Sequence, residues 1–158
     1  MQKNKQVGVL LEDFSASQLT FYAVKNMNSH LENSDVDFVG FFENSTTSMI
    51  PPRFSTMSAS EIWSFGGVAV ATSVTTSLSL QKACLPIKKY FYVWDLEWSR
   101  RGGAEYEYTI QAYRDPNIKL IARSSSHAKA IKNYCNRDVC GVVDNFNIDQ
   151  LIGIINNE

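Results

Sequence analysis

Short apolar segments alternate along this chain with longer segments in which apolar residues recur at helical spacing. Continuous apolar runs of this length are typical of strands that are covered on both faces. Six such strands are predicted, at 6–11, 35–42, 68–72, 88–94, 118–122 and 139–143. Strands that alternate with helices need crossover connections, which produce a parallel sheet. The pattern therefore predicts an α/β fold, a single Rossmann-like doubly wound domain over 1–158 with a mostly parallel six-stranded sheet and helices on both faces.

Polar positions and prolines mark the boundaries of the predicted helices. The first helix lies within 16–32, and Ser58 and Glu61 have the spacing of a capping box that begins a short helix. Pro51 and Pro52 exclude regular helix or a central strand, so we expect 53–57 to be extended or irregular chain. Later helices are predicted after 73–77, over 105–113, after 124–126 and after 144–147.

Charge and cysteine content narrow the classes of partner. Lys and Arg number 15 against 16 Asp and Glu, so no overall field attracts nucleic acid or an anionic membrane. The first apolar segment is too short for a signal peptide or a membrane span, which predicts a cytoplasmic protein. Cys84, Cys135 and Cys140 lack CxxC spacing, and the chain has only two histidines that could act as further metal ligands. We therefore expect buried, reduced thiols and no metal site. No motif calls for a cofactor.

The segment 90–103 (YFYVWDLEWSRRGG) is the strongest candidate for chemistry, because a buried strand ends there in polar and aromatic residues. Ligands bind beyond the carboxyl ends of strands in open α/β sheets. Asp95 and Glu97 are two apart, so on extended chain their carboxylates point the same way and can act as catalytic groups in one pocket. Trp98, with Trp94, offers flat apolar faces for a sugar ring. The alternative is a solvated loop, in which the acids pair with the arginines that follow, Arg100 and Arg101.

Other strand ends carry further candidates for substrate binding. Glu12 and Asp13 follow the first strand, where a dinucleotide-binding fold would have glycines, and carboxylates repel pyrophosphate but accept hydrogen bonds from a polyol. Hydroxyl groups follow two more strands, and they either cap helices or hold a sugar hydroxyl or an anion. These are Thr72 and Ser73 after the third strand, and Ser124 and Ser125 after the fifth. Neither GxGxxG after the first strand nor GxxxxGK[ST] is present, which disfavours dinucleotides and ATP.

Several of these segments together resemble a known family. Residues 89–97 (KYFYVWDLE), 103–106 (GAEY), Tyr113 and 119–126 (KLIARSSS) resemble the second half of the amino-terminal, acceptor-side domain of GT-B glycosyltransferases. The likeness is to the rhamnosyltransferase-like group, and 142–149 (VVDNFNID) is similar to the passage that closes that domain.

The resemblance implies roles for particular residues. Asp95 and Glu97 match the acidic pair at the strand end, 124–126 match the serines of the next strand end, and Asn145 matches the asparagine of the closing passage. In such enzymes the amino-terminal domain binds the acceptor and a second domain holds the nucleotide sugar. The sequence runs to Glu158, where that second domain is expected to begin, so we expect no donor-binding domain in this chain and expect catalysis to require one on a separate chain.

Three functions follow as hypotheses. The first is a glycosyltransferase-like protein that binds a sugar or a glycosylated small molecule, with a base such as Asp95 deprotonating an acceptor hydroxyl. The second is a non-catalytic binding or assembly module, a homo-oligomer in which Trp63, Trp98 and the tyrosines form a protein interface. The third is a small enzyme acting on a nucleotide or sugar, with its site completed by a second copy of the chain.

Overall fold

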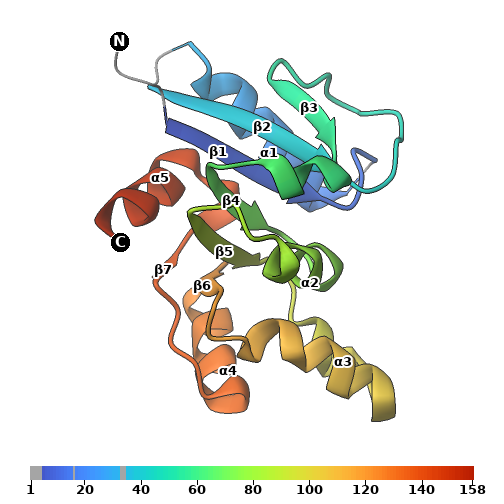
Figure 1. Cartoon of the computed structure of the whole chain (residues 1–158). Helices are drawn as coiled ribbons and strands as arrows, with labels where there is room; N and C mark the ends of the chain where they lie inside the picture. The colour runs from blue at the N-terminus through green and yellow to red at the C-terminus, as the bar shows by residue number, and fades with distance from the viewer. Residues whose placement is uncertain (1–4, 16, 33–34) are drawn as a thin grey trace.

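The fold is built on one all-parallel sheet with the strand order β3-β2-β1-β4-β5-β6-β7 (Figure 1). The computed structural model describes residues 5–15, 17–32 and 35–158, and within them seven strands pair in parallel. The strands are β1 Lys5–Leu11, β2 Val36–Phe42, β3 Ser55–Ser58, β4 Val68–Ala71, β5 Lys88–Val93, β6 Lys119–Ala122 and β7 Gly141–Val142. The chain builds outward from β1 in one direction and from β4 in the other, which is the Rossmann-like, doubly wound arrangement.

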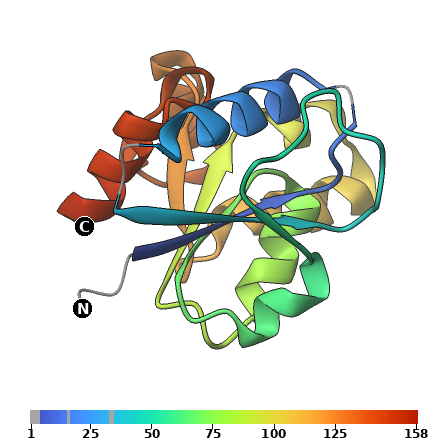
Figure 2. The same cartoon turned by 90° about the horizontal axis from the view of Figure 1, so that it is seen from above.

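Helices cover both faces of the sheet. The α-helices are α1 Gln18–His30, α2 Val74–Lys82, α3 Gly103–Arg114, α4 Ser125–Cys135 and α5 Ile148–Asn157. Three 3-10 helices accompany them: η1 Ala59–Ser64, η2 Glu97–Arg100 and η3 Asp144–Phe146. Buried side chains of α1 and α5 pack on one face, whereas those of α2, α3, α4 and η1 pack on the other. Figure 2 shows α1 and α5 side by side.

Alternation along the central strands explains the continuous apolar runs in the sequence. In β5, Tyr90 and Tyr92 belong to the core under α1 and α5, and Phe91 and Val93 belong to the core under the other helices. Successive side chains of a strand point to opposite faces, so a strand that is covered twice is apolar at every position. This agreement confirms the predicted α/β fold.

The predicted number of six strands is wrong, because β3 was missed. It pairs in parallel with β2, with Val39 opposite Ser55 and Phe42 opposite Ser58. All four residues of β3 are exposed at the edge of the sheet, so neither an apolar run nor a strict alternation marks them. The expectation of buried thiols is also wrong for Cys84, which is exposed, although Cys135 is buried.

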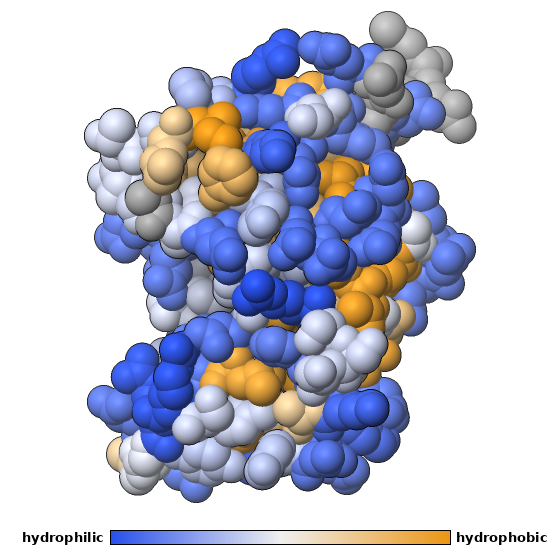
Figure 3. Space-filling model, turned by 180° about the vertical axis from the view of Figure 1, so that it is seen from behind, coloured by the Kyte–Doolittle hydropathy of each residue, from blue (hydrophilic) through white to orange (hydrophobic). Residues whose placement is uncertain are grey.

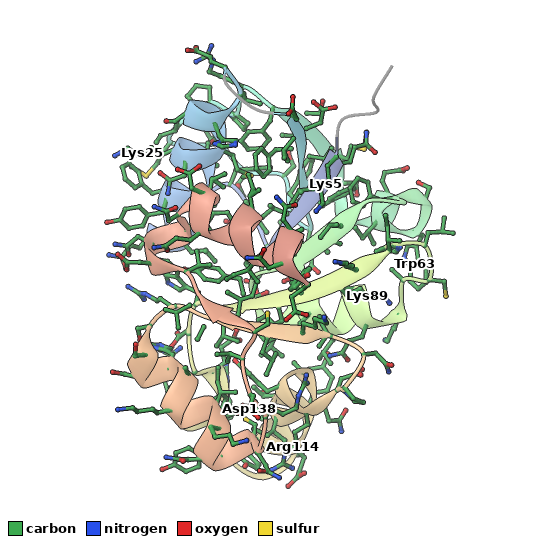
Figure 4. The ribbon with its side chains drawn as sticks, turned by 90° about the vertical axis from the view of Figure 1, so that its left-hand side faces the viewer. Lys5, Lys25, Trp63, Lys89, Arg114 and Asp138 are labelled. Carbon is green, nitrogen blue, oxygen red and sulfur yellow. The ribbon has the colours of Figure 1, made fainter. Side chains whose placement is uncertain are left out.

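The last helix, α5, is held at its carboxyl end by lysines from three strands. From β1, the Lys5 Nζ donates to Asn156 Oδ1 at 2.7 Å. From β5, the Lys88 Nζ donates to the Ile155 carbonyl at 3.5 Å. From β6, Lys119 forms an ion pair with Glu158. Cations near the carboxyl end of a helix are favoured by its dipole. Figure 4 shows α5 lying beside α1, with Lys5 close to it. The apolar side of α5, including Leu151, is buried against the sheet.

Truncation of Leu151 tests how strongly α5 is bound. The side chain is 1% exposed, so we expect Leu151→Ala to lower the free energy of unfolding by about 2–5 kcal/mol, through lost burial and a cavity. Urea titration measures the change. Asn157→Ala, at an exposed position of the same helix, is the control and should change stability by less than about 0.5 kcal/mol. Equal effects of the two substitutions would show that α5 is not part of the core.

Candidate functional site

A cleft of about 300 Å³ lies at the point where the strand order reverses. The strands β1 and β4 are neighbours, but β1 leads to α1 on one face and β4 leads to α2 on the other. The two helices therefore diverge from the gap beyond the carboxyl ends of these strands, which is where ligands bind in this class of sheet. We call this the switch-point cleft. Eight of the twelve predicted site residues line it: Glu12, Asp13, Thr72, Ser73, Asp95, Glu97, Arg100 and Arg101.

Glu97 is held at the amino end of α2. Its Oε1 accepts a hydrogen bond from the backbone N–H of Val74, the first residue of α2, at 3.0 Å. Burial raises the pKa of the Glu97 carboxyl, the Val74 amide opposes this rise, and the carboxylates of Glu12 and Asp95 add to it. A carboxyl with a raised pKa beside a cleft has the property that a general base needs.

The buried side chain of Tyr113 positions the loop that carries both acids. The Glu97 backbone N–H donates to the Tyr113 hydroxyl at 3.2 Å, and that hydroxyl donates to the Asp95 carbonyl at 3.0 Å. The Tyr113 ring packs against Phe91 and Trp98, with centroid distances of 5.0 and 4.5 Å. Burial raises the pKa of Tyr113, so its hydroxyl keeps its proton and remains a donor. The loop is thus tied to the core.

Asp95 differs from Glu97 in its surroundings. It forms an ion pair with Arg100, and both side chains are about half exposed. Arg101 instead pairs with Glu105 at 3.4 Å. The ion pair expected from the solvated-loop interpretation is therefore present for Asp95, whereas Glu97 is bonded to a backbone amide.

The hydroxyl groups after β4 cap α2. Ser73 Oγ accepts from the Thr76 N–H at 3.2 Å, and Thr76 Oγ1 accepts from the N–H groups of Thr72 and Ser73 at 3.1 and 3.0 Å. The Thr72 hydroxyl donates to the Leu10 carbonyl at 2.6 Å. Together with Val74, these amides have partners within the protein. The turn into α2 consequently differs from a phosphate-binding loop, whose amides point at the ligand.

The exit of β1 places acids on the other side of the cleft. Asp13 Oδ1 accepts from the Ser15 N–H at 2.9 Å, which forms a tight turn before α1. Glu12 is exposed, and burial together with the Glu12 charge raises the pKa of the neighbouring Glu43. This side of the cleft therefore offers hydrogen-bond acceptors.

Trp94 was named with Trp98 as a face for a sugar ring, whereas Arg123, which stacks on Trp94, was not among the predicted binding residues. Trp94 lines the cleft, and the Arg123 guanidinium lies 3.8 Å from the centre of its ring. Arg123 also donates to Gln18 Oε1 at 3.4 Å, which links the end of β6 to α1. Arg123 directly follows the predicted strand 118–122, so the rule that strand ends carry ligands could have found it.

Four predicted residues do not line the cleft. Trp98 is 5% exposed and packs edge-on against Tyr113, so the tryptophan at the cleft is Trp94. Ser124 caps α4 by accepting from the His127 N–H at 3.2 Å, and Ser125 is an exposed residue in the first turn of that helix. Asn145 has a φ of 44°, and its carbonyl accepts from Asn26 of α1 at 3.0 Å.

Two further properties concern metals and membranes. Among residues 5–15, 17–32 and 35–158, no three His, Cys, Asp or Glu side chains are grouped so that they could hold a metal ion. None of the helices in the same residues has the length and apolar character needed to cross a membrane.

Seen from behind, the surface is mostly hydrophilic, with its apolar residues in separate patches (Figure 3).

The raised pKa of Glu97 predicts how stability depends on pH. Above the ordinary pKa near 4.5, the native state still holds a proton that the unfolded state has lost, so stability falls as the pH rises towards the native pKa. Glu97→Gln removes this dependence. We therefore expect the difference in unfolding free energy, wild type minus variant, to fall as the pH rises above about 4.5 and then to level off. Urea titrations between pH 4 and pH 7 measure it.

The exposed Glu61 of η1, which lines neither this cleft nor the cleft beside α3, supplies the matched control, Glu61→Gln. A difference for Glu97→Gln that stays constant with pH would contradict the raised pKa.

Comparison with known proteins identified no relative of this chain. No family model matches the chain, and neither a curated protein nor a solved structure matches it. The resemblance to GT-B acceptor domains therefore stays a prediction.

Proposed function

We propose that this chain binds a neutral polyhydroxylated ligand, a sugar or a glycosylated small molecule, in the switch-point cleft. The observation that carries the proposal is the combination of carboxylates, arginines and the Trp94 ring around one cleft at the sheet edge. Carboxylates accept hydrogen bonds from hydroxyl groups, arginines donate them, and an aromatic face packs against a sugar ring. A pocket with a few convergent polar groups is the usual form of a small-molecule site.

The electrostatics of α2 favour a neutral ligand over a phosphate. A helix amino terminus attracts anions, but here the Glu97 carboxylate already accepts from the Val74 amide. Two like unit charges 4 Å apart repel each other by about 4 kcal/mol near a protein surface. A phosphate at this helix would have to displace Glu97 or tolerate it, which supports a ligand without phosphate.

The same site supports a role in glycosyl transfer when a separate chain supplies the donor-binding domain. Glu97 would take the proton of an acceptor hydroxyl, the oxygen would bond to the anomeric carbon, and the nucleoside diphosphate would leave with its bonding electrons. Glu97 suits this role better than Asp95, because its carboxyl is more buried and has a raised pKa, whereas Asp95 is paired with Arg100. Asp95 and Arg100 would then bind the acceptor.

Direct binding measurements test the proposal. A glycan array first identifies the sugar, and calorimetry then measures its affinity for the wild type, Asp95→Asn and Glu97→Gln. We expect each substitution to weaken binding about tenfold or more, which corresponds to about 1.4 kcal/mol, because a charge-assisted hydrogen bond is lost. Glu61→Gln is the matched control and should bind as the wild type does.

Inorganic pyrophosphate is the opposing probe. If the wild type binds pyrophosphate in the switch-point cleft and no sugar, the proposal is wrong and the cleft belongs to a phosphate-containing ligand.

Exposed apolar residues before β4 and β5 favour assembly as a second function. Trp63, Leu85 and Ile87 are 52%, 57% and 76% exposed, and they lie just before β4 and β5. The Ile87 N–H donates to the Gly67 carbonyl at 3.1 Å, so the two segments adjoin. Aromatic and large apolar residues are frequent anchors of protein interfaces. Trp98, in contrast, is buried within the chain and does not contribute to such a surface.

Mass in solution separates this second function from the first. If the chain self-associates through these exposed apolar residues, we expect a dimer in sedimentation equilibrium. We expect Trp63→Ser to convert this dimer to a monomer. Tyr134→Ser, at an exposed aromatic position on α4, is the control and should leave the mass unchanged. A monomeric wild type would exclude homo-oligomeric assembly at the concentrations measured.

A further inference from the structure

A second cleft adjoins the switch-point cleft and shares two residues with it. This cleft, of about 420 Å³, lies between the amino-terminal turn of α2 and one side of α3, and we call it the α2–α3 cleft. Glu97 and Arg101 line both clefts. The two clefts therefore meet at these two side chains.

The lining of the α2–α3 cleft has the same chemistry as the first cleft. From α3 come Glu105, Tyr108 and Thr109, which share one side of the helix because of their spacing, and from α2 comes Thr75. These residues provide a carboxylate, hydroxyl groups and an aromatic ring. The Tyr108 side chain is 60% exposed although it lines a cleft, so its ring is open to a ligand.

The connection between η2 and α3 positions the shared residue Arg101. Gly103 has a φ of +57°, a conformation that glycine adopts without strain, and it begins α3 directly after the loop. The turn brings the Arg101 guanidinium to 3.4 Å from Glu105 of the α2–α3 cleft. The Arg101 side chain is 51% exposed, so solvent already reaches the boundary between the clefts.

We infer that the ligand is an extended oligosaccharide, with one sugar unit in the switch-point cleft and the next in the α2–α3 cleft, where it packs against Tyr108. This inference rests on the proposed function. Small-molecule pockets usually measure roughly 300–1,000 Å³, and the switch-point cleft alone is at the lower end of this range. The second cleft supplies the room and the additional hydrogen-bonding groups that a chain of sugars requires.

The experiment compares ligands of increasing length. The monosaccharide that binds best on a glycan array is measured by calorimetry beside its linear di- and trisaccharide, with the wild type and Tyr108→Ala. We expect the wild type to bind the disaccharide at least tenfold more tightly than the monosaccharide. Tyr108→Ala should remove most of this gain and leave the affinity for the monosaccharide unchanged. Tyr134→Ala, an exposed tyrosine outside both clefts, should behave as the wild type.

Each outcome decides between the proposals. If the monosaccharide binds and length adds no affinity, or if Tyr108→Ala weakens neither ligand, the extended ligand is excluded and the proposed function stands. If no sugar of any length binds, both fail. Thermal melting of Tyr108→Ala at the wild-type temperature shows that the variant is folded, as its exposed position leads us to expect.

Discussion

The parallel pairing of β1 with β4 determines where the switch-point cleft forms. Because the chain crosses over one face after β1 and over the opposite face after β4, the carboxyl ends of these neighbours are left uncovered. The helices α1 and α2 diverge there, and the end of β5 brings its acids to the same place. The cleft is thus a consequence of the topology, and the side chains around it decide what it binds.

The acids at the cleft are held by the core beneath them. Tyr113 reaches from α3 through the packed aromatic rings, and its single hydroxyl both donates to and accepts from the loop between Asp95 and Glu97. This arrangement orients the Glu97 carboxylate towards the amino end of α2 before any ligand arrives. Preorganised polar groups lose less conformational entropy on binding, so the aromatic core contributes to the site as well as to stability. The two clefts on either side of Glu97 share this support.

The fold class, and the end of the sheet at which the candidate site lies, could be read from the apolar pattern of the chain alone. A central parallel strand is covered on both faces, so its apolar run can be recognised without knowing its neighbours, as in 90–94. Polar residues at the end of such a strand then indicate where a ligand could bind, and most of the predicted residues, from Glu12 to Arg101, line one cleft. The edge strand β3 was not predicted, because all four of its residues are exposed and no apolar pattern marks them.

Which of these residues line the cleft depends on how distant segments pack together. Trp94 and Trp98 are four positions apart and alike in type, but the turn of η2 sends Trp98 into the core against Tyr113 and leaves Trp94 at the cleft. The different surroundings of Asp95 and Glu97 likewise come from partners distant in the chain, since the N–H that binds Glu97 belongs to Val74. Local pattern reports the spacing of residues along one segment. Beyond the end of a strand, packing between segments sets the direction of a side chain. The spacing of residues along one segment carries no information about that packing.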